Sequence, residues 1–292
     1  MKGESAARHP IVDAHLHVFS MNVVRYPLAA NAPYEPEPAP VEQLLITMGM
    51  SGVDVAVAVQ PQPYRWDNSY LSDCLEAHPD RLIGICLADP RSPEGPAELR
   101  RLCAGGRFQG FRLNVGPDDD GAWLADGTVD PLWSVASEMN LVVCVQMTPR
   151  HAPHLRAQAA RFPGVRFVVD HLGLPDVGEP PPYQRFQNVL RLAELPTAHV
   201  KLSALFAFSK QDFPYVDTLP FVELAHKEFE ASRMLWGTDF PNVLQECGYQ
   251  AALDHVRGEI PFLTDVDREW ILGRTAASLW RLPKGKAPDL ND

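Results

Sequence analysis

A pair of histidines near the start of the chain has a spacing that suits metal or substrate binding. His15 and His17 lie in the segment Asp13-Ala14-His15-Leu16-His17, at the end of an apolar run. If this run is a strand, residues two apart point to the same side, so the two imidazoles project together. Such a pair can bind one metal ion or one substrate. An HxH pair alone is more often satisfied by hydrogen bonds in a loop, so the functional interpretation depends on further motifs.

Two later apolar runs also end in ionisable residues. The segment Val168–Gly173 contains Asp170 and His171, and burying such a pair at a strand end is costly unless both residues have partners. The segment Trp236–Pro241 places Asp239 directly after the last run. A carboxylate at that place can bind a metal ion and take a proton from an attacking water, and its structural alternative is a local Asx-turn.

Polar and aromatic residues beside these motifs are candidates for substrate binding. Arg112 ends a fourth apolar run, where its guanidinium suits a substrate carboxylate or an oxyanion, although a structural salt bridge is the alternative. Lys201 lies similarly in the seventh run, with the structural and functional interpretations equally open. Tyr64 and Trp66 follow the second run and are expected at the rim of the pocket.

The apolar pattern predicts the elements that must position these residues. Short apolar runs bounded by turn residues are typical of buried parallel strands. Eight such runs are present: 11–18, 54–60, 82–88, 108–115, 141–147, 165–171, 198–203 and 234–238. Helices are predicted between them and after them, at 40–50, 69–77, 96–103, 131–139, 153–162, 183–194, 218–230 and 265–279.

Alternating strands and helices predict an α/β fold with a parallel sheet. An open, doubly wound sheet is one solution, but eight strands favour closure into a (β/α)8 TIM barrel, which needs roughly 250 residues. We expect a single domain over residues 1–282 and a tail over 283–292. The long segment 19–39 follows the first strand, so it would lie at the C-terminal face of the barrel, where active sites form.

Composition excludes some classes of partner. The net charge of −11 argues against nucleic-acid binding, which needs clustered Lys and Arg, but it does not argue against a small anionic substrate. No run approaches the roughly 18 apolar residues of a membrane span, and the N-terminus lacks the apolar core of a signal peptide. The five scattered cysteines form no CxxC pair, which favours reduced thiols and a cytoplasmic location. The sequence leaves open whether the protein forms a homo-oligomer.

The three motifs, in this order, resemble those of the amidohydrolase superfamily. Within it the chain is similar to the amidohydrolase-2 branch that contains 2-pyrone-4,6-dicarboxylate lactonase and the sugar lactonases. The resemblance runs from about Ile11 to Leu282. Supporting segments are Arg25-Tyr26-Pro27, Gly52-Val53-Asp54, Val59-Gln60-Pro61, Asp67-Asn68-Ser69-Tyr70, Gly110-Phe111-Arg112 and Val200-Lys201-Leu202-Ser203.

The resemblance implies roles for the motif residues. The first-strand histidines of the superfamily usually bind a divalent metal, which matches His15 and His17. The histidine after the sixth strand matches His171, and the last-strand aspartate that activates water matches Asp239. Many relatives have a further metal-binding histidine at the end of the fifth strand. Here Gln146 occupies that place, as a weak, neutral ligand or a substrate contact.

These differences argue against a two-metal site, because the fourth strand offers Arg112 and no lysine that could be carboxylated. Two alternatives remain, since some lactonases of this branch work without metal. Either one Zn²⁺ or Mn²⁺ is bound by residues from the set His15, His17, His171 and Asp239, or the histidines polarise a carbonyl directly while Asp239 deprotonates water.

The sequence therefore predicts a hydrolase that opens a lactone or related carboxylic ester of a small anionic metabolite. The alternative is a metal-dependent decarboxylase of the same superfamily, although decarboxylases usually keep the fifth-strand histidine. An iron-dependent oxygenase and a non-enzymatic binding protein are less favoured. The intact set of ionisable residues at strand ends argues against the last class.

Overall fold

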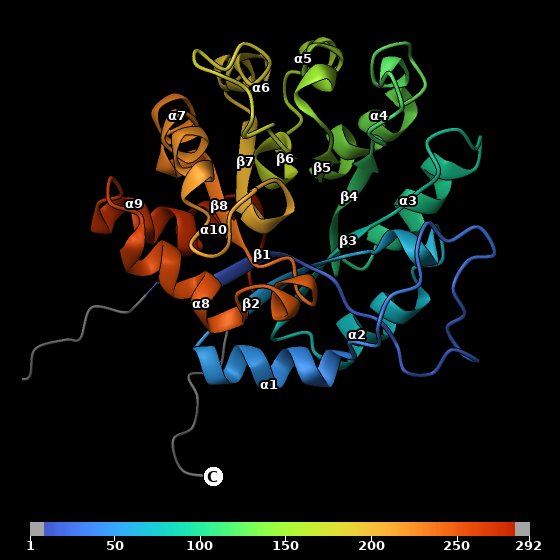
Figure 1. Cartoon of the computed structure of the whole chain (residues 1–292). Helices are drawn as coiled ribbons and strands as arrows, with labels where there is room; N and C mark the ends of the chain where they lie inside the picture. The colour runs from blue at the N-terminus through green and yellow to red at the C-terminus, as the bar shows by residue number, and fades with distance from the viewer. Residues whose placement is uncertain (1–8, 284–292) are drawn as a thin grey trace, which may run out of the picture.

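The structure is a computed structural model that describes residues 9–283. Eight strands follow one another in chain order around one sheet, and each neighbouring pair is parallel. Helices surround the strands (Figure 1), so the predicted (β/α)8 barrel is confirmed. The strands are β1 (Val12–Leu16), β2 (Val55–Val59), β3 (Leu82–Cys86), β4 (Phe108–Asn114), β5 (Val142–Gln146), β6 (Phe167–Val169), β7 (Ala198–Ser203) and β8 (Met234–Gly237).

The strands are buried on both faces, which explains their almost continuous apolar sequences. In β2, the sequence VAVAV is buried at every position. Alternate residues belong to two separate packed clusters: Val55, Val57 and Val59 pack in one, while Ala56 and Ala58 pack in the other. The first cluster fills the barrel interior, and the second packs the strands against the helices, as expected for a barrel covered by helices.

The helices place an apolar face against the strands. In α1, for example, Val41, Leu44 and Met48 are buried at helical spacing. The helices are α1 (Val41–Ser51), α2 (Ser69–Ala77), α3 (Gly95–Cys103), α4 (Asp130–Met139), α5 (Ala152–Arg161), α6 (Gln187–Leu190), α7 (Leu219–Phe229), α8 (Tyr249–Asp254), α9 (Asp265–Glu269) and α10 (Thr275–Leu279). No helix of the part described is long and apolar enough to cross a membrane.

Three helical segments differ from the prediction. The helix expected over 183–194 is α-helical only at Gln187–Leu190 and continues as a 3-10 turn at Arg191–Glu194; it cannot include Tyr183, whose left-handed φ of 57° helical residues avoid. The predicted helix over 265–279 is interrupted by a π-helical turn at Trp270–Arg274. Helix α8 was not predicted, because six residues are too few to show a helical period.

The barrel closes between β1 and the segment that follows β8. The amide of Asp239 donates to the carbonyl of His15 at 2.8 Å, and the amide of His17 donates to the carbonyl of Phe240 at 2.7 Å. Gly237 gives room for this seam, since a Cβ there would lie 2.7 Å from the Cβ of His15. The closure therefore brings the first and last motifs into contact.

The segment 19–39 forms a closed loop at the C-terminal end of β1, as predicted. Phe19 and Ala39 pair antiparallel at its base through two backbone hydrogen bonds. The hydroxyl of Tyr64 accepts a hydrogen bond from the amide of Ser20, and the Tyr26 ring lies 5.0 Å from the Tyr70 ring. These contacts fix the loop to the segments that follow β2.

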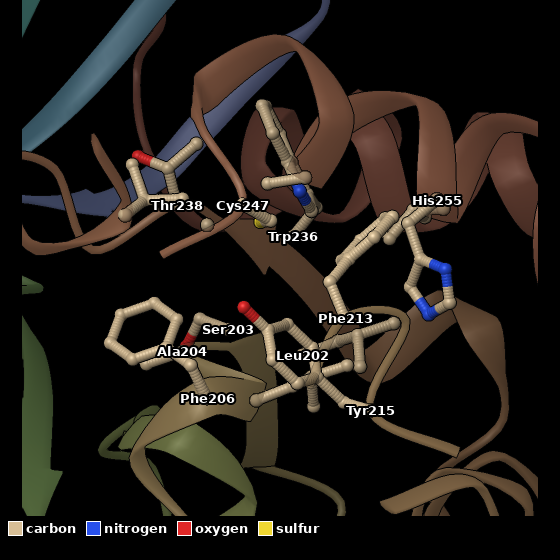
Figure 2. Close-up of a pocket in the computed structure, with 15 residues that line it drawn as sticks. Leu202, Ser203, Ala204, Phe206, Phe213, Tyr215, Trp236, Thr238, Cys247 and His255 are labelled. Atoms are coloured by element: carbon tan, nitrogen blue, oxygen red, sulfur yellow. The ribbon is translucent and has the colours of Figure 1, made fainter. Parts of the chain in front are cut away.

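A small cavity lies between the C-terminal parts of β7 and β8 and the loops after them (Figure 2). Its volume of about 30 Å³ has room for one or two waters and its walls are mostly apolar, including Phe206 and Trp236. It is too small for a metabolite. The expected tail, 283–292, lies outside the described residues except for Pro283, and the domain bounds stay a prediction.

Candidate active site

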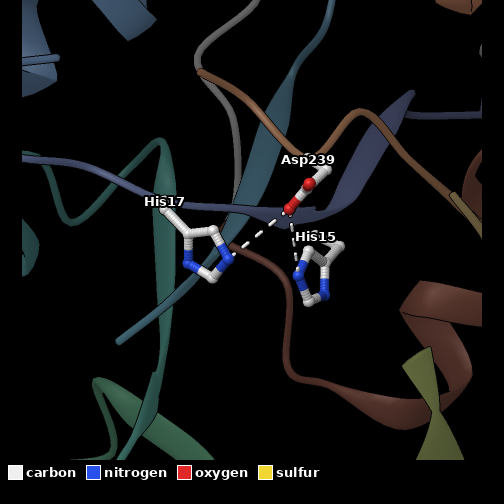
Figure 3. Close-up of side chains that lie close together, drawn as sticks. All are labelled: His15, His17 and Asp239. Atoms are coloured by element: carbon white, nitrogen blue, oxygen red, sulfur yellow. Dashed lines mark ion pairs between the residues drawn. The ribbon is translucent and has the colours of Figure 1, made fainter. Parts of the chain in front are cut away.

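Three of the predicted residues meet at the C-terminal face of the barrel (Figure 3). The Nε2 atoms of His15 and His17 each lie 3.5 Å from Oδ1 of Asp239, and all three side chains are at least nine-tenths buried. Their ligand atoms lie within 4.8 Å of one another. Within residues 9–283, they form the one cluster of His, Cys, Asp and Glu that meets this criterion.

An irregularity in β1 aims both histidines into the barrel. The pairing register between β1 and β2 shifts between Asp13 and Leu16. Ala14 packs in the interior cluster, and His15 also faces inward, where it contacts Lys201 of β7. A bulge of this kind puts two consecutive residues on one face and re-aims those that follow. His17 then points inward as well, two residues after His15.

Asp239 is held with one carboxylate oxygen facing the histidines. Asn242 donates from Nδ2 to Oδ2 of Asp239 at 2.9 Å, which leaves Oδ1 facing His15 and His17. Burial raises the pKa of Asp239 to about 7, against the opposing effects of the Asn242 hydrogen bond and the Arg112 charge. Its backbone has a φ of 60°, an uncommon conformation of the kind found at functional sites.

His171 lies beside His15 rather than within the three-residue cluster. The ring centroids of His15 and His171 are 4.5 Å apart, and Nδ1 of His171 lies 2.9 Å from the hydroxyl of Ser203. His171 follows the short strand β6 with a left-handed φ of 53°, which turns its ring toward the barrel axis. Burial and Arg112 lower its pKa to about 3, against the opposing effect of Asp170, so the imidazole is neutral at pH 7.

A network of buried charges lies around Asp170. Its carboxylate accepts from Nε of Arg112 at 2.8 Å and lies 2.9 Å from Nζ of Lys201. Asp170 and Lys201 are fully buried. Burial opposes the ionisation of Asp170, but the charges of Lys201 and Arg112 hold its pKa well below the usual range. The network therefore keeps an anion beside His15.

Hydrogen bonding determines which ring nitrogens are available. Nδ1 of His17 lies 2.8 Å from the carbonyl of Val59, which can only accept, so His17 carries its proton on Nδ1 and Nε2 is a free acceptor. Nδ1 of His15 has neighbours of opposite kind: Lys201 at 3.0 Å, which donates, and Asp170 at 3.4 Å, which accepts. Lys201 and Asp170 therefore set the tautomer of His15.

Both imidazoles are neutral at pH 7. Burial and the Arg112 charge lower the pKa of His17 to about 3, and burial and the Lys201 charge lower that of His15 well below its usual value. A neutral imidazole is the form that binds metal. Nε2 of His15 is buried and has no hydrogen-bond partner among the described residues. Two imidazoles and one carboxylate are suitable donors for one Zn²⁺ or Mn²⁺, so these residues fit one divalent ion.

The other predicted residues fall into two groups. Arg112 and Trp66 line one pocket at the barrel mouth. Gln146 ends β5 beside Asn114 and is partly exposed, so it is open to a ligand. Lys201 and Tyr64 instead contact other groups of the protein. Lys201 contacts Asp170 and His15, and the Tyr64 hydroxyl accepts a hydrogen bond from the loop after β1.

Sequence reasoning missed several residues that hold the site together. Asp13 accepts from the amide and the hydroxyl of Thr238, at 3.0 and 2.6 Å, and so ties β1 to the end of β8. Burial raises the pKa of Asp13 to about 6, against these hydrogen bonds. Asp13 and Ser203 both lie within sequence motifs quoted above, and this position is the signal that could have identified them. Asn242 lies three residues after Asp239, and no sequence signal marks it.

Comparison with known proteins identifies the family. The model of the amidohydrolase family matches residues 12–282. The chain belongs to the amidohydrolase family. It is 30% identical over 237 residues to L-fucono-1,5-lactonase of Burkholderia ambifaria, which covers 79% of this chain and 80% of that enzyme. It is 29% identical over 232 residues to 4-sulfomuconolactone hydrolase of Rhizobium radiobacter, covering 79% and 75% of the two chains.

Solved structures of other amidohydrolases share the fold. A probable 2-pyrone-4,6-dicarboxylic acid hydrolase from Acinetobacter baumannii, with citric acid bound, superposes with a TM-score of 0.80 at 21% identity, covering 92% of this chain and 98% of that one. An amidohydrolase from Burkholderia multivorans with bound zinc gives a TM-score of 0.78 at 24% identity, covering 94% and 100%. At these identities, the likeness shows the fold alone.

Proposed function

We propose that the protein hydrolyses a lactone, or a related carboxylic ester, of a small anionic metabolite. One observation carries the proposal: Oδ1 of Asp239 faces the Nε2 atoms of two neutral histidines at the mouth of the barrel. This arrangement suits the activation of a water molecule next to a carbonyl. The names of the two relatives, a sugar lactonase and a muconolactone hydrolase, support the same class of reaction.

In the proposed reaction, Asp239 is the general base. Water attacks the lactone carbonyl carbon and gives a proton to Oδ1 of Asp239, while Asn242 holds Oδ2 in place. When the ring C–O bond breaks, the leaving alkoxide takes the proton back from Asp239. The product is a hydroxy acid, and no further reactant is needed.

Arg112 and His171 are proposed to act on the substrate. Nε of Arg112 is occupied by Asp170, but the side chain also lines the mouth pocket, where its other N–H groups can orient an anionic group or an oxyanion. His171 is held by Ser203 beside His15, where it can contact the reacting group. Gln146 and Trp66 stay predicted substrate contacts, and so does Tyr64, although its hydroxyl is already bonded to the amide of Ser20.

Residues for one divalent ion are present at the same place. His15, His17 and Asp239 would hold it, with His171 as the neighbouring candidate. A bound Zn²⁺ or Mn²⁺ supplies Lewis-acid polarisation of the carbonyl and a lower pKa for water. Because Lys201 is fully buried against Asp170 and His15, we propose that it positions His15 and does not contact the substrate.

The test is a panel of lactones, assayed by acid release with protein of known metal content, with and without a chelator. We expect ring opening of at least one carboxylated lactone. Release of carbon dioxide from hydroxybenzoates with no lactone hydrolysis would overturn the proposal and favour the decarboxylase alternative. A cytoplasmic location also stays a proposal, supported by five cysteines that are all free thiols. The homo-oligomeric state is not assigned.

A further inference from the structure

A second pocket adjoins the site at the C-terminal ends of β2, β3 and β4. Its volume is about 230 Å³, enough for a group of several heavy atoms. Arg112 lines this pocket and also contacts Asp170 of the site, so the pocket and the reaction centre share one side chain. Two tryptophans, Trp66 and Trp123, contribute apolar walls.

The pocket has an excess of positive charge. Three arginines line it, Arg65, Arg91 and Arg112, against one carboxylate, that of Asp89. Oδ1 of Asp89 accepts a hydrogen bond from the backbone amide of Arg91 and so is already occupied. Among the ion pairs of residues 9–283, none involves Arg65 or Arg91. Neither guanidinium group therefore forms an ion pair with a carboxylate in the chain described, and the Arg91 charge lowers the pKa values of Asp119 and Asp126 only at longer range.

Both guanidinium groups are nonetheless held in place. Arg65 donates from an Nη atom to the carbonyl of Asn31 at 2.9 Å, and its Nε is buried with no hydrogen-bond partner among the described residues. The guanidinium of Arg91 lies 5.4 Å from the centre of the Trp123 ring. The backbone of Arg65 has a φ of 50°, an uncommon conformation for a residue with a side chain.

We propose that this pocket binds a carboxylate of the substrate, remote from the carbonyl that is hydrolysed, between Arg65 and Arg91. Planar guanidinium groups match a carboxylate through paired hydrogen bonds, and the tryptophan walls suit the carbon skeleton that carries it. The buried amide oxygen of Asn114, which also lacks a partner among the described residues, can accept from a neighbouring hydroxyl. The inference rests on the proposed lactonase function and names its substrate class.

The experiment compares two lactones that differ only in one group: a ring with a carboxylate and the same ring with a primary carboxamide. Wild type, Arg65→Gln and Arg91→Gln are assayed, with Arg101→Gln as a matched control. Arg101 is an exposed arginine on α3 that pairs with Glu98. We expect each pocket variant to raise KM for the carboxylate at least tenfold with kcat within about twofold, which corresponds to losing a charged hydrogen bond. The carboxamide and the control should show no change.

A binding measurement separates this proposal from the lactonase function. Calorimetry with glutarate, a dicarboxylate that cannot be hydrolysed, should show binding to wild type and to Arg101→Gln, with at least tenfold weaker binding to Arg91→Gln. Arg91 donates no side-chain hydrogen bond to the described protein, so this variant should fold normally, as a melting curve will verify. Equal glutarate affinity in wild type and a folded Arg91→Gln, or equal KM for both lactones, would overturn the proposal. If glutarate binds as expected but no lactone is hydrolysed, the lactonase function fails and the anion site stands.

Discussion

Replacing Lys201 by methionine tests the buried network beneath His15. The Lys201 side chain is fully buried, with Nζ 2.9 Å from Asp170 and 3.0 Å from Nδ1 of His15. Methionine has a similar length and volume, so little packing energy is lost. The main effect is electrostatic, because Asp170 keeps a single full positive partner, Arg112.

Removing one partner of a buried ion pair typically costs about 3–5 kcal/mol, because it leaves an uncompensated charge. For a protein of this size, the melting temperature should fall by on the order of 10 °C. Lys210→Met is the matched control. Lys210 is 68% exposed and pairs with Asp176 at 3.6 Å, so its loss should cost about 0–1 kcal/mol.

The assay is urea unfolding of Lys201→Met, Asp170→Asn, the double variant and Lys210→Met. The double variant should be less destabilised than the sum of the two single variants by about 1–3 kcal/mol, because the two charges interact directly. Zinc binding to folded Lys201→Met should be tighter than to wild type, since a cation is removed and Nδ1–H of His15 is left to face Asp170. Two results would refute this account of Lys201. One is a double variant whose loss of unfolding free energy equals the sum of the losses of the two single variants. The other is a Lys201→Met protein that is as stable as Lys210→Met.

Three further predictions concern the seam, the base and acid stability. Asn242→Ala removes the donor to Asp239, and kcat should fall about tenfold in initial-rate assays at an unchanged melting temperature; an unaltered kcat would argue that Asp239 needs no such support. Gly237→Ala puts a Cβ 2.7 Å from that of His15, so unfolding in urea should show a loss of about 1–3 kcal/mol, and a neutral result would contradict the tight seam. Burial lowers the pKa of His199 to about 4, so His199 stays neutral in the folded state while the unfolded chain binds a proton below pH 6.5. This one group should therefore cost up to about 3 kcal/mol of stability between pH 6.5 and 4. In urea titrations at pH 7 and 4.5, His199→Asn should lose this share of the pH dependence, while the shares of His15, His17 and His171 remain.

The barrel and the meeting of its motifs were predictable from sequence. Each motif follows a short buried apolar run, and the C-terminal ends of parallel strands lie at one face of a barrel. The order of the runs and motifs is therefore enough to predict that His15, His17 and Asp239 lie together. The extent of β6 was less predictable, because the left-handed conformation of His171 ends the strand before the apolar pattern does.

The partners of these residues were not predictable in the same way. The register shift in β1, which turns His15 inward, leaves no trace in the alternation of residue types. Lys201 and Asp170 meet because β6 and β7 present them to the same interior, and residue type alone left Lys201 equally open to a substrate role. Arg65 and Arg91 belong to loops, whose conformation depends on contacts such as that between Arg65 and Asn31.

The central claim is that Asp239 takes a proton from water in the hydrolysis of a lactone. The most direct test is the turnover of the best lactone substrate by Asp239→Asn, measured with metal content and a melting curve on the same sample. The change is nearly isosteric, so the fold should survive, and loss of a positioned general base should lower kcat by about 10²–10⁴-fold. A folded Asp239→Asn protein that hydrolysed the lactone at close to the wild-type rate would contradict the mechanism.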